Sequence, residues 1–304
     1  MAFHSARLAA LPVLVLSIAA TPPPERVIAP DGLEPVTING ITRTIRVDPG
    51  APAMPIITRD YADAAGMKAG MFGFAMGFGP KVMVSGGTAV ARVAFGKVEP
   101  AKLRIGFTPK PYAVNVAGVF GPASLAAPVI RFRLREPVAG ERTTSFPMVD
   151  QGGLFGGWAE RFAIIMVEGE PLRIRFDPHH PRTLANAGAA VRLARAYGGT
   201  LSGSISPAEI AFGVERPVRT MTLATPLAMG PLTIGTLGVR TVDHGHTDTI
   251  ADADTHADPN EVVVTGKGKH DIKRDRLSIG ADQLNRCSSI VFDKPAKQIR
   301  LSCR

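Results

Sequence analysis

Apolar and polar residues alternate along most of the chain in short runs, and glycine, proline or asparagine separates these runs. This period of two is typical of half-buried β-strands joined by tight turns. Residues 36–48 and 162–177 are the clearest examples, because an Asn-Gly or a Glu-Gly pair divides each into two apolar runs. Helical periodicity is confined to short segments such as residues 58–66 and 189–197. The pattern therefore predicts an all-β fold, mainly strands with a few short helices.

One phrase occurs twice in the chain. Residues 45–52 read Ile-Arg-Val-Asp-Pro-Gly-Ala-Pro, and residues 174–181 read Ile-Arg-Phe-Asp-Pro-His-His-Pro. Each copy overlaps the end of a strand–turn–strand unit, so the repeat predicts an internal duplication that presents Asp48 and Asp177 at equivalent strand ends. Either Asp alone is explained by a turn, since Asp-Pro commonly starts one. In a duplicated context the two favour a site with two carboxylates.

A second motif follows each Asp. The sequence Val-Phe-Gly ending at Gly121 and the sequence Ser-Ile-Gly ending at Gly280 are each followed by a leucine and a further strand. The second half is longer, and one insertion over residues 243–272 accounts for the difference. Between the first Asp and Gly121, residues 81–98 predict a hairpin that turns at Ser-Gly-Gly (85–87).

Shifts in composition divide the chain into segments. We expect, in order, a signal peptide (1–20), a linker (21–35), a first lobe (36–135), a junction between lobes (136–160) and a second lobe (161–304) that carries the insertion (243–272).

The first segment has the features of a secretory signal. Residues 8–20 are apolar, follow a short stretch with one arginine, and end in small residues that suit cleavage. This apolar run is too short to span a bilayer, and Pro12 with the prolines at 22–24 argues against a buried core helix. No other stretch is long enough to cross a membrane. We therefore expect an exported protein, periplasmic or secreted.

The two cysteines fit that destination. Cys287 and Cys303 flank a predicted hairpin whose turn is centred on Pro295, and pairing symmetric about that proline places them opposite each other. Directly opposed residues in an antiparallel pair have α-carbons about 4.5–5.5 Å apart, within reach of a disulfide. The alternative is two free thiols in a core strand, and an oxidising compartment favours the bond.

Charge and composition narrow the possible partners. The net charge is +9, yet the basic residues are scattered along strands without interleaved aromatics, so we expect no nucleic-acid partner. Residues 243–258 contain three histidines and five aspartates, but their spacing fits neither a compact metal site nor a calcium loop. We expect a solvated, disordered insertion there, no metal and no cofactor. A metal-responsive module is the weaker alternative.

Taken together, the motifs resemble those of the aspartic peptidases. The run Val-Asp-Pro-Gly-Ala around Asp48 resembles the family's Asp-Thr-Gly-Ala, and the runs ending at Gly121 and Gly280 resemble its apolar-apolar-Gly motif. Residues 279–293 are similar to the end of retropepsin-like domains. Two such units resemble the bilobal, pepsin-like arrangement of two related β-barrel-like lobes. The resemblance implies hydrolysis of peptide or protein substrates by a shared acid pair, Asp48 and Asp177, with substrate-binding roles for Gly50, Gly121 and Gly280.

The sequence departs from the family pattern beside each acid. The family has Thr or Ser there, whose hydroxyl ties the two loops together, whereas this chain has Pro49 and Pro178. His179 replaces the glycine of the second copy, and no tyrosine lies in residues 81–98. Two functions therefore stay open. One is an active aspartic endopeptidase; the other is a catalytically impaired pseudo-protease that binds extended peptides or an envelope partner in the same cleft. The oligomeric state is not fixed by the sequence.

Overall fold

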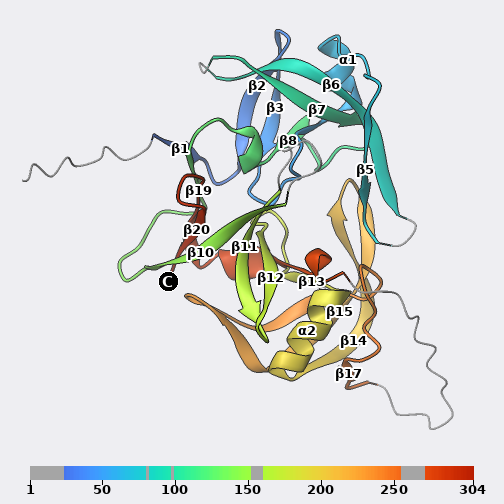
Figure 1. Cartoon of the computed structure of the whole chain (residues 1–304), viewed down its shortest axis with the longest axis vertical. Helices are drawn as coiled ribbons and strands as arrows, with labels where there is room; N and C mark the ends of the chain where they lie inside the picture. The colour runs from blue at the N-terminus through green and yellow to red at the C-terminus, as the bar shows by residue number, and fades with distance from the viewer. Residues whose placement is uncertain (1–23, 80–81, 97–98, 152–159, 255–270) are drawn as a thin grey trace, which may run out of the picture.

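The computed structural model describes residues 24–79, 82–96, 99–151, 160–254 and 271–304, and the fold is mainly β (Figure 1). The described strands form two sheets. The first sheet has the strand order β2-β3-β8-β4-β7-β6-β5, and pairing of β2 with β6 closes six of its strands into a barrel. Its strands are β2 (Leu33–Ile38), β3 (Ile41–Val47), β4 (Ile56–Thr58), β5 (Gly73–Gly77), β6 (Met83–Phe95), β7 (Ala101–Thr108) and β8 (Gly118–Phe120).

The second sheet is large and open. Within the described ranges it has thirteen strands, in the order β1-β9-β19-β20-β10-β11-β12-β18-β13-β16-β15-β14-β17. These are β1 (Glu25–Ile28), β9 (Val129–Arg133), β10 (Arg142–Gln151), β11 (Glu160–Val167), β12 (Glu170–Phe176), β13 (Leu184–Asn186), β14 (Gly199–Ala211), β15 (Val214–Met229), β16 (Leu232–Arg240), β17 (Ala251–Asp252), β18 (Arg276–Ile279), β19 (Cys287–Asp293) and β20 (Gln298–Cys303).

Short helices accompany both sheets. They are α1 (Arg59–Ala64), η1 (Pro122–Ser124), α2 (Ala187–Tyr197), η2 (Ile272–Arg274) and α3 (Ala281–Leu284). The longest, α2, begins where the Asn186 side chain accepts a hydrogen bond from the Ala189 N–H, at 3.0 Å, and ends at Gly198 in the left-handed conformation. The predicted helices over 58–66 and 189–197 are confirmed as α1 and α2.

The same pairing scheme recurs in the two sheets. In the first, β3 and β8 are parallel, β8 and β4 are antiparallel, and β4 and β7 are parallel. In the second, β12 and β18, β18 and β13, and β13 and β16 have the same three relations in the same order. The repeated phrase thus occupies equivalent places, at the ends of β3 and β12.

Both predicted strand–turn–strand units are confirmed, as β2–β3 and β11–β12. Their turns have positive φ at both central residues, 48° and 89° at Asn39 and Gly40 and 52° and 79° at Glu168 and Gly169. This backbone suits two-residue hairpins, because its twist matches that of the flanking strands. Local turn chemistry therefore fixes the register that delivers each Asp to a strand end.

The hairpin predicted over residues 81–98 is wrong. Residues 85–87 do not turn; they lie inside β6, which pairs with β5 on one side and β7 on the other. A β-carbon at Gly87 would lie 2.9 Å from the Phe107 ring, and one at Gly86 would collide with the Phe107 carbonyl oxygen. These glycines therefore allow close packing, and the actual hairpin joins β5 to β6.

The structure adds strands within the predicted linker and junction, and these pair across the predicted segments. The linker 21–35 contains β1, where Ile28 is fully buried and the strand pairs in parallel with β9. Strand β9 belongs to the second sheet, whereas the sequence predicts its residues in the first lobe (36–135). The junction 136–160 contains β10, which pairs with β20 and β11. The order of strands along the chain does not predict these pairings, because the partners of β1, β9 and β10 include strands that are distant in sequence.

The insertion 243–272 is ordered at its start, contrary to expectation. Asp243 is buried with 1% exposure and pairs with Arg240, and Asp252 and Asp254 pair with Arg219. Residues 255–270 and the signal peptide predicted over 1–20 lie outside the described residues. In the ranges that are described, no helix is long and apolar enough to cross a bilayer.

The predicted disulfide is confirmed. Cys287 and Cys303 are bonded, fully buried and directly paired between β19 and β20. The bond closes a loop with a sequence separation of 16 residues, which restricts the unfolded chain.

Replacing both cysteines by alanine is expected to lower the free energy of unfolding by about 3 kcal/mol. Urea unfolding of the double variant checks this value, and reduction of the wild type should give a similar loss. Equal midpoints for the oxidised wild type and the double variant would contradict the prediction.

Candidate active site

Asp48 and Asp177 occupy equivalent backbone positions directly after β3 and β12. The Asp48 N–H donates to the carbonyl oxygen of Phe120 at 2.9 Å, and the Asp177 N–H donates to that of Ile279, also at 2.9 Å. The two acceptors are the last residues of β8 and β18, and these strands run parallel to β3 and β12. Each half of the chain therefore presents one acid at the carboxyl ends of a parallel strand pair.

The two acid-bearing loops pack against each other. A β-carbon at Gly50 would lie 2.9 Å from the Phe176 carbonyl oxygen and 3.3 Å from the β-carbon of Asp177. The turn that carries Asp48 therefore touches the other acid, and a side chain at Gly50 would push the loops apart. Glycine permits this close approach of the two backbones.

His179 takes the place of the corresponding glycine in the second copy. Its Nε2 lies 3.5 Å from the position of a β-carbon at Gly32, so the ring packs on the chain that enters β2. Burial lowers the pKa of His179, and Arg46 lowers it further. The ring therefore fills space beside the acid loops as a neutral group near pH 7.

The Asp48 carboxyl is almost fully enclosed. It is 2% exposed, and its Oδ1 accepts the Gly50 N–H at 2.7 Å. Burial and then the nearby Asp177 carboxylate raise the pKa of Asp48 to about 7, while the Gly50 N–H, Arg175 and Arg46 oppose the rise. The Asp48 carboxyl is therefore protonated below about pH 7, beside the Asp177 carboxylate.

Arg175 is a member of the site that the sequence analysis did not identify. Its guanidinium lies 3.7 Å from Oδ2 of Asp177 and donates a 2.9 Å hydrogen bond to the hydroxyl of Tyr112. Burial alone would lower the pKa of Arg175, but Tyr112, Asp177 and Glu160 raise it overall. The repeated sequence could have indicated this arginine, because Ile-Arg-x-Asp places an arginine on the same strand face as each acid.

Gly121 and Gly280, like Gly50, line neither of the two cavities that Arg175 and Phe78 border, one of which Asp177 also lines. A β-carbon at Gly121 would lie 3.1 Å from the Pro52 carbonyl oxygen, and one at Gly280 would collide with Arg182. The Gly280 N–H donates to the Thr183 hydroxyl at 3.0 Å. These contacts support the loops that hold the acids, whereas the sequence analysis gave both glycines substrate-binding roles.

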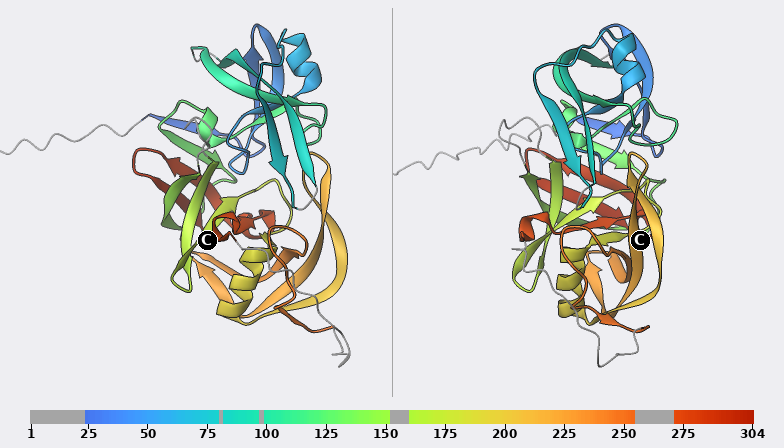
Figure 2. Two further views of the ribbon diagram at one scale, coloured as in Figure 1. Left: turned by 45° about the vertical axis from the view of Figure 1, so that its right-hand side comes forward. Right: turned by 90° about the vertical axis from the view of Figure 1, so that its right-hand side faces the viewer.

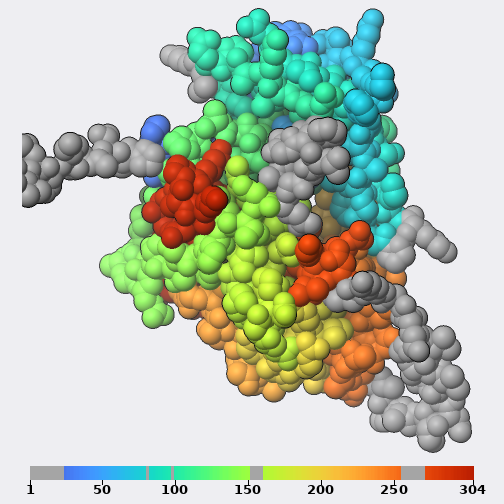
Figure 3. Space-filling model, in the orientation of Figure 1, coloured from blue at the N-terminus to red at the C-terminus, as the bar shows by residue number. Residues whose placement is uncertain are grey.

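Two hairpin tips meet above the acids. Phe78 follows β5, and Phe212 lies in the turn between β14 and β15; their rings are 6.0 Å apart. Phe212 also packs edge-on against Tyr112 at 5.1 Å. Figure 2 shows the cyan β5–β6 hairpin of the first sheet reaching toward the golden β14–β15 hairpin of the second, and in Figure 3 the cyan strands lie at the right-hand edge of the molecule. Two cavities lie beneath, of about 230 and about 250 Å³, and Arg175 and Phe78 line both.

The described residues contain no group of three or more His, Cys, Asp or Glu side chains placed to hold a metal ion. The candidate chemistry therefore rests on the acid pair, the adjacent arginine and the two hairpin tips. No protein-family model matches the sequence, and neither does any curated protein.

Proposed function

We propose that this chain is an exported, aspartic-peptidase-like protein with two related lobes in a pepsin-like arrangement. The observation that carries the proposal is the contact between the two acid loops, which raises the pKa of Asp48 to about 7 through burial and the Asp177 carboxylate. A buried carboxyl beside a second carboxylate is the arrangement that general acid–base hydrolysis of a peptide bond requires. The recurring strand scheme and the hairpins above the acids support the same assignment.

The proposed reaction uses water and no cofactor. One carboxylate of the pair accepts a proton from water as the oxygen attacks the peptide carbonyl, and the protonated partner donates a proton to the carbonyl oxygen. Strand β5 ends the first sheet, so its free edge can pair with an extended peptide while the hairpin tips exclude water. The buried disulfide suits a periplasmic or secreted location.

Cleavage is expected to persist up to about pH 7 and then to fall about tenfold for each further pH unit, because the pair loses its shared proton. A peptide library digested between pH 4 and pH 9 and analysed by mass spectrometry checks this. Asp177→Asn should cleave at none of these pH values. A rate that rises steadily above pH 7 would contradict acid-pair chemistry.

The second candidate is a pseudo-protease that binds an extended peptide or an envelope partner without cutting it. Arg175 favours this function, since its guanidinium 3.7 Å from Asp177 offsets the negative charge that would draw a proton from water. Pro49 and Pro178 also remove the hydroxyls that brace the family's acids. Peptide binding that is unchanged in Asp177→Asn, with no turnover by the wild type, would decide for the pseudo-protease.

A further inference from the structure

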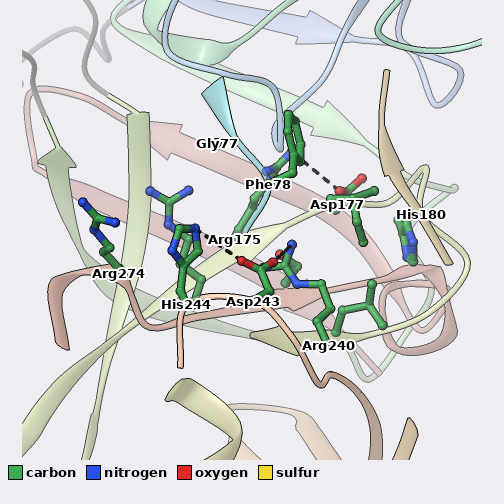
Figure 4. A pocket seen from close by; sticks show the side chains of 13 residues that line it. Gly77, Phe78, Arg175, Asp177, His180, Arg240, Asp243, His244 and Arg274 are labelled. Atoms are coloured by element: carbon green, nitrogen blue, oxygen red, sulfur yellow. Dashed lines mark ion pairs between the residues drawn. The ribbon is translucent and has the colours of Figure 1, made fainter. Parts of the chain in front are cut away.

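The cavity beside Asp177 is unusually rich in arginine. Its volume is about 230 Å³, and its wall includes the guanidiniums of Arg175, Arg240, Arg274 and Arg276. Figure 4 shows the labelled arginines and Asp177 around this space, with Phe78 above Arg175. None of these arginines was assigned a role from the sequence.

Arginines outnumber carboxylates among the residues that line the cavity, although each arginine has a carboxylate partner. Arg240 pairs with Asp243 at 2.9 Å, Arg276 with Glu160 at 3.2 Å, and Arg175 with Asp177 at 3.7 Å. Among the described residues, the ion pair of Arg274 is with Asp271 at 3.7 Å, and both of these side chains are more than half exposed. The cavity wall itself thus includes four arginines and two carboxylates, Asp177 and Asp243.

The arginines also act on one another. Burial lowers the pKa of Arg240, and the nearby Arg175, Arg276 and Arg216 lower it further, against the attraction of Asp243. The Nε atoms of Arg175 and Arg240 are buried and have no hydrogen-bond partner among the described residues. Like charges held this close in a protected space are stabilised when an anion enters between them.

We propose that this cavity is a subsite for a carboxylate of the bound peptide, so that the protein selects chains with an acidic group next to the scissile bond. This inference rests on the proposed function, because Asp177 lines the same cavity and places the bound group beside the reacting bond. Phe78, Leu184 and Ile210 line the cavity too and supply apolar surface for the methylene groups of a glutamate side chain. The carboxylate comes either from an acidic side chain or from the C-terminus of the peptide.

Binding to the Asp48→Asn variant at pH 6 tests the subsite without turnover. The probes are two amidated peptides that differ at one position, which is Glu in one and Gln in the other. This position flanks the preferred cleavage site. If the wild type cuts no peptide, it is placed at the centre of an arbitrary extended sequence. We expect the Glu peptide to bind about 10- to 100-fold more tightly, as charge-assisted hydrogen bonds to arginine predict. A third peptide ends at that position with a free carboxylate. Preference for it over the internal Glu identifies the terminus as the source.

Two variants locate the effect. Arg274→Gln removes the guanidinium whose ion pair is the most exposed of the four. The double variant Arg240→Gln with Asp243→Asn removes a guanidinium of the cavity together with its carboxylate partner, so that no buried charge is left alone. Both should bring the Glu-to-Gln affinity ratio closer to one. Arg300→Gln is the matched control, since Arg300 pairs with Asp293 at 3.4 Å and does not line the cavity. It should keep the wild-type ratio.

The outcomes separate this inference from the proposed function. Equal binding of the Glu and Gln peptides, or no measurable binding of either, overturns the subsite even if the wild type cleaves peptides. A large ratio that all three arginine variants keep also overturns it. If the wild type cleaves nothing but the ratio is large and falls in the two cavity variants, the subsite stands and hydrolysis is refuted.

Discussion

Asp48→Asn is expected to lose peptide cleavage, by roughly 10²- to 10⁴-fold, and at the same time to stabilise the folded protein at pH 8. The loss follows because an amide neither shares a proton with Asp177 nor donates one as a carboxylic acid does. The gain follows because the wild-type carboxyl is buried beside another carboxylate, which raises its pKa from 3.8 to about 7. A stable but inactive variant would show that the site is organised for chemistry rather than for stability.

The sign of the stability change comes from proton linkage. A carboxyl whose pKa is raised on folding contributes stability in full below its unfolded pKa, and this contribution disappears as the pH rises through the folded pKa. For Asp48 the loss takes place between about pH 4 and pH 7 and amounts to roughly 4 kcal/mol. The asparagine variant does not undergo this loss, so its advantage over the wild type should grow across that interval.

Urea unfolding of the wild type and Asp48→Asn at pH 4, 6 and 8 measures this difference. Asp63→Asn, which removes an exposed carboxylate from α1, is the control and should retain cleavage. An Asp48→Asn protein that is less stable than the wild type at pH 8 would show that the two acids do not share a buried environment.

Arg175→Met is expected to lower the free energy of unfolding by about 3–5 kcal/mol at pH 7. The substitution preserves much of the side-chain volume but leaves Asp177 without its arginine partner and leaves Glu160 with Arg276 alone. It also removes the donor to the Tyr112 hydroxyl. An uncompensated charge in such an enclosed site is costly.

Arg46→Met is the matched control for this variant. Arg46 stands at the same place in the first copy of the repeated phrase, yet it has no ion pair among the described residues. Its loss should therefore lower the free energy of unfolding much less than the loss of Arg175 does. Equal losses for the two methionine variants at pH 7 would refute the network assigned to Arg175.

Much of the framework follows from local pattern. The positive φ values at Asn39-Gly40 and Glu168-Gly169 are the ones that two-residue turns demand, so the sequence determines both hairpins and their register. Each hairpin then delivers its Asp to a strand end. The placement of residues 287 and 303 on either side of one short turn likewise predicted the disulfide. The strands themselves pair one residue out of the register symmetric about Pro295, and a β-bulge between Cys287 and Ser289 brings the two cysteines opposite each other. These features depend on residues close together in the chain.

Contacts between segments that are distant in sequence were decided only by the tertiary structure. Strands β1 and β9 join a sheet whose other members come from residues beyond 140, and β6 runs straight through Ser-Gly-Gly because its neighbours approach too closely for side chains. The contact between the Gly50 loop and Asp177, the charge network of Arg175 and the arginine-lined cavity arise in the same way. The alternation of apolar and polar residues specifies which face of a strand is buried, but not which distant strand covers it. Which distant strand covers a given face depends on the packing of the whole core. The environment that sets the charge of each acid depends on the same packing.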